Sequence, residues 1–280
     1  HNGYDDPQFS SFYGQTLPLL KRGIPVELVH MENTPFKDTF NGLQVLVMSY
    51  SNMKPMKSEY HNYLADWVKK GGTLVYCGED VDPYQTVLEW WNTEGNAYKA
   101  PSEHLFEAMG LSRNPGDGTY RFGKGTVIVM REDPKHFVLK GGNDRKYFET
   151  IASAYESKTG KKIEIKNNFM VERGPYTIAA VMDESSSKEP LKLSGLYIDL
   201  FDKDLPILTV KQINPGEQGY LYDLNKVLGK VKAKVLCGAS RIYDEKVGKQ
   251  SYSFVAKSPL HTTNVSRVLL PRKPGKVLVN

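Results

Sequence analysis

Short apolar strand patterns alternate with helical patterns through the first part of the chain, and this alternation limits the fold more than any other feature. Residues 24–31 (IPVELVHM) and 43–49 (LQVLVMS) are β-branched apolar runs of the kind that form strands buried on both faces. Thr73–Cys77 is a third such run, and residues 125–131 (GTVIVMR) read as a closing strand. Strands joined by helices over short connections form a mostly parallel sheet covered on both faces. We therefore predict an α/β domain over residues 1–160.

Three helices are predicted between these strands. Ser58 and Ser102 are placed as N-caps of two of them, and Asp82 with Pro83 begins the other, since Asp caps well and Pro fits the first turn. Apolar residues recur in each at the spacing of one helical face. The three stripes consist of Tyr60, Tyr63, Leu64, Trp67 and Val68, then Tyr84, Val87, Leu88 and Trp91, then Leu105, Phe106 and Met109.

A further helix is predicted at the front of the chain, over residues 6–22, with a kink at Pro18. Its inward side chains are expected to be Phe9, Phe12, Tyr13 and Leu20. Doubly wound sheets usually have a strand before this helix, and residues 1–5 do not read as one. We expect that this strand was lost with a missing N-terminus.

From about residue 163 the pattern changes to short strands separated by turns with Gly, Pro, Asn or Asp. Residues 176–182 read as a strand covered on both sides, and residues 231–243 with 251–257 read as a hairpin. Further strands are expected at 191–201, 265–270 and 276–279. This spacing predicts a small antiparallel β-sandwich over residues 161–280. The boundary is expected within residues 157–162 (SKTGKK), after a helix that ends near Tyr155.

Composition and charge exclude several classes of partner. The net charge of +5 comes from 37 basic and 32 acidic residues spread along the chain, with no basic block interleaved with aromatics, so no nucleic-acid partner is expected. No apolar run approaches the ~20 residues that cross a bilayer, so no membrane partner is expected either. Cys77 and Cys237 form no metal or disulfide pattern, and the phosphate-binding loop is absent. We expect neither a metal nor a cofactor.

Cys77 ends a predicted strand at the edge of the sheet where α/β proteins bind ligands, so it is a candidate nucleophile. A nucleophile elbow needs small residues two positions before and after, and Val75 and Glu79 stand there. The helix that should follow at once begins only near Pro83, too late to activate the thiolate. No histidine stands in a sequence context that marks it as the base. We interpret Cys77 as a buried strand residue and predict no catalytic residue in this chain.

The acidic loop after Cys77 is the candidate ligand or interface surface. It carries Glu79, Asp80 and Asp82, with Tyr84 and Trp90 beyond them. Carboxylates at a strand end can bind a cation or sugar hydroxyls, and an exposed tryptophan can stack on a sugar or contact another domain. The alternative is that Asp82 only caps a helix, that the other two acids are solvated, and that Trp90 packs under the following loop.

The order of elements resembles a known arrangement. The stretches LPLLKRGIPVELVHMEN, LQVLVMSYSNMKPMKSEYHNYLADWVKKGGTLVYCGED and FGKGTVIVMR resemble the class I glutamine-amidotransferase-like domain of glycoside hydrolase family 42 β-galactosidases, and NNFMVERGPYTIAAVMDES resembles the entry into the sandwich that follows it there. In that family such a domain follows a catalytic (β/α)₈ barrel and helps to form a trimer. The resemblance implies a flavodoxin-like, amidotransferase-like domain followed by a β-sandwich.

The resemblance implies a non-catalytic accessory region of a larger carbohydrate-active enzyme, because neither the amidotransferase catalytic set nor the barrel is present. Its partners would be the catalytic barrel of the same polypeptide, a carbohydrate, and a second copy of the chain. The compartment stays open, with a periplasmic or extracellular location favoured if the parent degrades polysaccharide. The alternatives are a free-standing amidotransferase-like hydrolase using Cys77, and a carbohydrate-binding module. The module would bind through the sandwich, whose strands show no obvious row of exposed aromatics although Tyr197, Tyr220 and Tyr222 could contribute.

Overall fold

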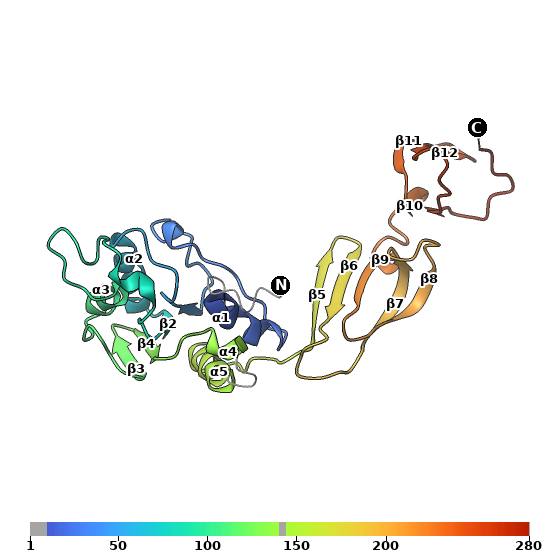
Figure 1. The fold of residues 1–280 in the computed structure, drawn as a ribbon. Coiled ribbons are helices and arrows are strands. Elements are labelled where there is room, and N and C mark those ends of the chain that lie inside the picture. Colours follow the sequence, from blue (N-terminus) through green and yellow to red (C-terminus); the bar gives the residue numbers. More distant parts are fainter. Residues whose placement is uncertain (1–9, 140–143, 280) are drawn as a thin grey trace. The chain divides into compact units, whose positions relative to one another are not determined.

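The computed structural model describes residues 10–139 and 144–279 of the chain. The chain forms two compact units, the first ending at Ile165 and the second beginning at Lys166 (Figure 1). Each unit has its own sheets and its own buried side chains. Among the described residues, no helix is both long and apolar enough to cross a membrane.

A four-stranded mixed sheet forms the centre of the first unit, with the strand order β1-β2-β4-β3. The strands β1 (Val45–Met48), β2 (Thr73–Cys77) and β4 (Gly125–Met130) are parallel, and β3 (Gly118–Phe122) is antiparallel to β4. The predicted strands at β1, β2 and β4 are therefore confirmed. The antiparallel hairpin of β3 with β4 was not predicted.

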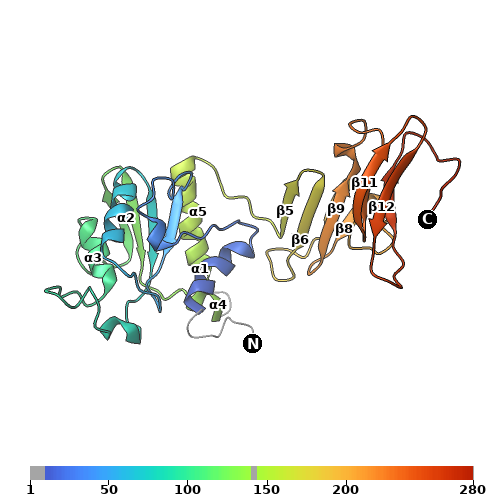
Figure 2. The ribbon, with the colours of Figure 1, turned by 90° about the horizontal axis from the view of Figure 1, so that it is seen from above.

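Helices cover both faces of this sheet (Figure 2). Side chains of β2 alternate between two cores because successive residues of a strand point to opposite faces. Leu74 and Tyr76 pack in one core with α2 (Glu59–Lys69) and α3 (Pro101–Ala108). Val75 and Cys77 lie in the other. That second core also takes side chains from three helices, namely α1 (Ser10–Leu20), α4 (His136–Leu139) and α5 (Arg145–Thr159).

Two predicted elements of the first unit were wrong. Residues 24–31 form no strand, and only the short 3-10 helix η1 (Met31–Asn33) lies at their end. Ile24 and Val26 pack against the core while Pro25 is exposed, which reproduces the alternation of a strand without a paired neighbour. Proline also lacks the N–H that strand pairing requires.

The predicted helix from Asp82 to Trp91 is the second error, since only η2 (Pro83–Thr86) forms. Side chains take the carbonyl groups that a longer helix would use. The Trp91 indole donates to the Gln85 carbonyl at 3.0 Å, and the Asn92 amide donates to the Val87 carbonyl at 2.9 Å. The expected stripe is therefore dispersed: Trp91 is buried, and Tyr84, Val87 and Leu88 are exposed.

The helix α1 packs with a different face from the predicted one. Phe12, Tyr13 and Leu20 are only half-buried, and Phe9 lies outside the described residues. The fully covered positions are mostly small: Ser10, Ser11, Gly14, Pro18 and Leu19. Small residues are needed because a Cβ added at Gly14 would lie 1.8 Å from the carbonyl oxygen of Pro134.

The predicted caps also need correction. Ser58 precedes α2 without a capping hydrogen bond from its side chain, and α3 begins after Ala100, so Ser102 lies in its first turn. The stripe of α3 is confirmed, with Leu105, Phe106 and Met109 all buried. In the predicted stripe of α2, Tyr63 is 41% exposed. His61 and Ala65 complete the buried face of this helix instead.

The second unit consists of antiparallel sheets. The largest has five strands in the order β5-β6-β9-β7-β8, and two smaller sheets pair β10 with β13 and β11 with β12. The strands are β5 (Asn168–Arg173), β6 (Tyr176–Val181), β7 (Leu191–Asp199), β8 (Ile207–Ile213), β9 (Gln218–Asp223), β10 (Lys234–Gly238), β11 (Arg241–Val247), β12 (Tyr252–Lys257) and β13 (Ser266–Leu269), with the 3-10 helix η3 (Leu224–Lys226) after β9.

Three strand predictions in this unit are corrected. The strand β6 is covered on one side only, because Thr177, Ala179 and Val181 are buried whereas Ile178 is 46% exposed. Residues 231–243 contribute to two strands in different sheets, and only β11 pairs with β12 as a hairpin. Residues 276–279 form no strand and are exposed.

The end of α5 marks the start of the connection between the units. The helix runs to Thr159, beyond the expected end near Tyr155, and Gly160 follows in the left-handed conformation with φ 70°. Glycine is the usual residue at this position because it adopts positive φ without steric cost. Residues 161–166 then have no regular secondary structure.

Candidate functional site

The carboxyl ends of β1, β2 and β4 lie at one edge of the sheet, where an α/β protein binds its ligands. The loops that leave these ends carry several buried polar side chains, namely Ser49, Ser51, Gln85 and Asp133. Two residues there, Asn52 and Asp80, have left-handed backbone conformations, with φ 61° and φ 58°. Asn and Asp tolerate this region better than other residues that carry a side chain.

Cys77 is fully buried at the end of β2. Its sulfur lies 4.0 Å from the Met130 sulfur, and Leu19 and Tyr147 belong to the same apolar core. Burial raises the pKa of the Cys77 thiol far above its ordinary value, with smaller contributions from Glu132 and Asp117. A thiol is nucleophilic only as the thiolate, so this environment suppresses the reactivity of Cys77.

Asp80 belongs to a buried polar network rather than to an open site. Its carboxylate accepts hydrogen bonds from the hydroxyls of Tyr76 and of Ser102, the latter at 2.7 Å. Arg131 completes an ion pair with it at 2.6 Å, and the two side chains are only 10% and 17% exposed. Burial, followed by the charge of Asp80, raises the pKa of Tyr76 well above its usual value, so the phenol remains a donor.

Arg131 is held from several sides. Its Nε donates to the Pro115 carbonyl at 2.8 Å, and its guanidinium carbon lies 5.1 Å from the centre of the Phe106 ring. Its Nη2 atom is buried with no hydrogen-bond partner among the described residues. Removing one partner of a buried ion pair costs roughly 3–5 kcal/mol because it leaves an unpaired buried charge, so each of Asp80 and Arg131 requires the other.

Asp82 organises the next turn of the same loop. It caps η2 by accepting the Tyr84 amide at 3.0 Å, and it pairs with Lys54 at 2.6 Å. The Lys54 ammonium also donates to the Tyr50 carbonyl at 2.5 Å. Burial lowers the pKa of Lys54, while its partner Asp82 opposes this shift. Asp82 therefore ties the loop after β2 to the loop after β1.

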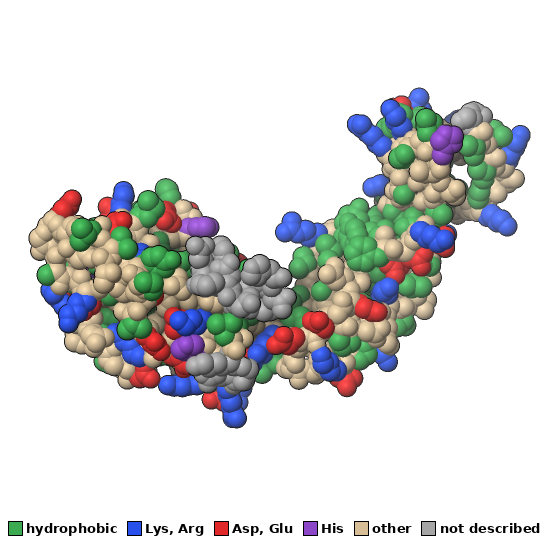
Figure 3. All heavy atoms as spheres, viewed as in Figure 1, with side chains coloured by type: hydrophobic (Ala, Val, Ile, Leu, Met, Phe, Trp, Pro, Cys, Tyr) green, Lys and Arg blue, Asp and Glu red, His purple; other side chains and the backbone are tan. Residues whose placement is uncertain are grey.

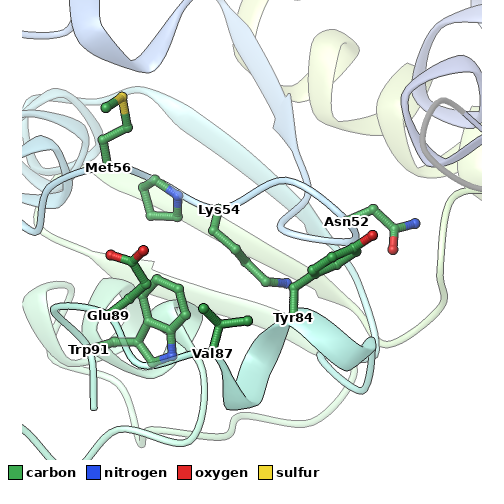
Figure 4. Close-up of a pocket in the computed structure, with 8 residues that line it drawn as sticks. Asn52, Lys54, Met56, Tyr84, Val87, Glu89 and Trp91 are labelled. Carbon is green, nitrogen blue, oxygen red and sulfur yellow. The ribbon is translucent and has the colours of Figure 1, made fainter. Parts of the chain in front are cut away.

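A pocket of about 310 Å³ lies between these two loops (Figure 4). One wall comes from the segment after β1 and the other from the segment around η2. The lining residues are Asn52, Lys54, Pro55, Met56, Tyr84, Val87, Glu89 and Trp91. Several large apolar side chains in and beside it are exposed, namely Met53, Met56, Val81, Tyr84, Val87 and Leu88.

Trp90 packs against a pair of histidines, so it is not the exposed tryptophan that one of the two sequence interpretations required. It is half-buried, and its indole donates to the Pro55 carbonyl at 2.8 Å. The rings of His61 and His104 lie 5.6 Å and 5.4 Å from it.

The two histidines bond to each other. Their Nδ1 atoms are 2.8 Å apart, and the Tyr50 hydroxyl is 2.6 Å from Nε2 of His61. A neutral pair satisfies these contacts, since one Nδ1 can donate to the other. Burial, with the nearby charge of His104 second, lowers the pKa of His61 to about 3.

The predicted site residues therefore separate. Asp80 and Asp82 belong to structural ion pairs, Tyr84 lines the pocket, and Trp90 donates to the Pro55 carbonyl in the loop after β1. Glu79 is exposed. Sequence reasoning missed Lys54, Arg131, Asn52, Glu89, His61 and His104. Arg131 ends the predicted strand 125–131, and Asn52 and Lys54 follow the predicted strand 43–49, so their places at the sheet edge could have indicated a role. The other three residues stand in segments without a motif.

No group of three or more His, Cys, Asp or Glu side chains within residues 10–139 and 144–279 is arranged to hold a metal ion.

Comparisons with known proteins do not assign the chain to a family. No protein-family model and no curated protein matches the sequence. Among solved structures, the GH42 β-galactosidase Gan42B is similar at 13% identity and TM-score 0.44, over 78% of this chain and 36% of that one. The β-galactosidase from Bacillus circulans sp. alkalophilus is similar at 11% identity and TM-score 0.44, over 77% of this chain and 37% of that one. This chain thus spans little more than a third of their length.

Proposed function

We propose that this chain is a non-catalytic accessory region of a larger carbohydrate-active enzyme, a glycoside hydrolase, in which it supports a catalytic barrel. The proposal includes a flavodoxin-like, amidotransferase-like domain over residues 1–160 and a β-sandwich over residues 161–280. Its partners are the barrel of the parent polypeptide, a carbohydrate, and a second copy of the chain. No nucleic acid or membrane takes part.

The observation that carries the proposal is that the polar groups after the strand ends are engaged in structural contacts. Asp80 is paired with Arg131, and Asp82 with Lys54. Cys77 lies in the apolar core with a raised pKa. The chemical groups that would perform catalysis at this edge of the sheet therefore hold the loops in place. The order of sequence elements, which resembles the accessory part of family 42 β-galactosidases, supports the enzyme class.

The alternative of a free-standing amidotransferase-like hydrolase requires a reactive Cys77, which the burial of its thiol opposes. Under the accessory role, Cys77→Ser should leave the glycosidase activity of the parent polypeptide unchanged. In the separate chain, a thiol reagent should label Cys237, which is half-buried, faster than Cys77. Single-cysteine variants assign the two rates, and unfolding in urea should make them equal.

Loss of activity in Cys77→Ser, in a protein with unchanged thermal stability, would contradict the accessory role. The upstream coding sequence gives a second, independent check. A barrel with two carboxylates at strand ends is expected there, because paired carboxylates cleave glycosidic bonds. A start codon immediately before this chain would defeat the proposal.

A carbohydrate-binding role of the second unit is a second candidate, favoured by its aromatic side chains. The rings of Tyr176 and Tyr220 are stacked with centroids 5.6 Å apart, and Phe201 lies 5.9 Å from Tyr220. Phe201 is 62% exposed, whereas Tyr222 at the other end of the row is buried. Hydrophobic side chains gather over β6 and β9 in Figure 3. Tyr176 and Tyr220 are half-buried, so Phe201 is the ring of this cluster that can stack on a sugar.

A further inference from the structure

We propose that the pocket between the loops after β1 and β2 binds a pyranose ring of a neutral saccharide. The proposal rests on the accessory role and deepens it, since it assigns the carbohydrate partner of that role to this pocket. The accessory role supplies only the ligand class, because a glycoside hydrolase would encounter saccharides. The place is the one where α/β sheets bind ligands, outside the carboxyl ends of parallel strands.

The walls of the pocket offer an aromatic and apolar surface. Tyr84 is 44% exposed and Val87 is 46% exposed. Met56, which is 74% exposed, extends this surface, and the buried Trp91 also borders the pocket. A pyranose has a face of C–H groups that packs on an aromatic ring, so Tyr84 is the expected stacking residue.

The polar groups of the pocket suit hydroxyls. Lys54 donates to the Tyr50 carbonyl and to Asp82, which leaves one of its three N–H donors for a ligand, and Glu89 supplies carboxylate acceptors. The Asn52 amide, which donates to Ser11 at 3.3 Å, lies at the same wall. A sugar hydroxyl donates one hydrogen bond and accepts others, so it needs such a mixture. In Figure 4 the Lys54 side chain extends towards Tyr84, whose hydroxyl points towards Asn52, and Glu89 lies beside Trp91.

The charge of the lining favours a neutral ligand. Lys54 and Glu89 are its two ionisable side chains of opposite sign, so their charges offset each other. The Lys54 ammonium is also paired with Asp82, which reduces its attraction for an anion. A phosphorylated ligand would meet no further cation in this lining, and a cationic ligand would meet no acid in it besides Glu89.

The pocket is preorganised by the fold. Asp82 holds Lys54 and caps η2, which carries Tyr84, while Trp90 fixes the opposite wall through the Pro55 carbonyl. A ligand that enters such a pocket loses less free energy to ordering of side chains. The volume of about 310 Å³ lies at the lower end of the range for small-molecule sites, which suits one ring with its neighbours in solvent.

Titration calorimetry of the chain with galactose, glucose, xylose, lactose, cellobiose and xylobiose tests the proposal, with tryptophan emission as a second signal because Trp91 lines the pocket. We expect saturable binding of at least one sugar. Tyr84→Ala should weaken it by about tenfold or more, as for truncation of a principal contact residue. Glu89→Gln changes an exposed side chain, keeps its shape, and should weaken binding severalfold.

Tyr243→Ala is the matched control, since Tyr243 is 41% exposed and belongs to the second unit. It should leave the affinity unchanged. Absence of binding across the panel would overturn the proposal, as would binding that survives both Tyr84→Ala and Glu89→Gln. Binding lost in Tyr220→Ala but kept in Tyr84→Ala would overturn it in favour of the second unit. Absence of sugar binding would not contradict the accessory role, because Cys77→Ser tests that role separately.

Discussion

Buried polar side chains in this protein are tied to one another, and their residue-scale chemistry determines what each can do. The carboxylate of Asp80 is bound by an arginine and two hydroxyls, so it cannot act on a ligand without breaking the fold. His61 has no exposed surface, and its ring nitrogens face Tyr50 and His104. Such groups are costly when unpaired and stabilising only as complete sets.

The histidine pair should make the protein sensitive to mild acid. The pKa of His61 in the folded chain, about 3, lies below the value near 6.5 of an unfolded histidine. The unfolded chain therefore takes up a proton in this window that the folded chain does not. The contribution of His61 to stability is complete above about pH 6.5 and decreases as the pH falls towards 3.

Urea unfolding at pH 8 and pH 5 measures this dependence. We expect the free energy of unfolding to decrease by about 2 kcal/mol through His61 alone, with the lowered pKa of His104 acting in the same direction. His61→Gln should remove most of this decrease even if the variant is less stable at both pH values. His30→Gln, which changes an exposed histidine, should keep it. An unchanged pH dependence in His61→Gln would show that the pair is not responsible.

At the scale of elements, strong apolar periodicity was sufficient to predict a helix or strand where no side chain competed for the backbone hydrogen bonds. The strand β2 and the helices α2 and α3 form where their patterns predicted them. The predicted helix after Asp82 failed because Trp91 and Asn92 bond to backbone carbonyls, which no periodicity reveals. The prediction for residues 24–31 failed because no strand pairs with them, and the inward alternation ends after Val26, since Leu28 is 63% exposed.

The junction of α2, β2 and β4 depends on a close approach of backbones. A Cβ added at Gly125 would lie 1.9 Å from the Val68 carbonyl oxygen and 2.4 Å from that of Gly72. We expect Gly125→Ala to lower the free energy of unfolding by roughly 3 kcal/mol, because backbone atoms cannot yield as a flexible side chain does.

Gly116→Ala is the control for this substitution. A Cβ at Gly116 meets nothing within 4 Å among the described residues. Its effect should stay within about 0.5 kcal/mol, as for most surface changes. Denaturant unfolding of the two variants measures both. Equal stabilities would mean that the start of β4 adjusts more easily than this packing implies.

At the scale of the whole molecule, the chain consists of two units with separate cores. The connection after Gly160 contains exposed lysines at 161 and 162 and no regular structure. Exposed segments of this kind are the preferred sites of proteolysis. We therefore expect trypsin to cleave first after Lys161 or Lys162.

Mass spectrometry of the first fragments identifies the site, and circular dichroism shows whether each fragment keeps its structure. Replacement of both lysines by glutamine should slow the first cut without changing either unit. First cleavage inside a sheet of either unit would contradict the division. Calorimetry is expected to resolve two transitions, since units with separate cores need not unfold together.

The sequence by itself determined that strands and helices alternate at the front, that strands follow, and that Cys77 lies in a buried strand. These follow from local periodicity and from the residues on either side of the thiol. Only the tertiary structure decided which polar groups meet. Lys54 and Asp82, Asp80 and Arg131, and His61 and His104 are far apart in the chain. Their pairing depends on the order in which strands join the sheet, and a hydrogen bond across that distance leaves no periodic trace in the sequence.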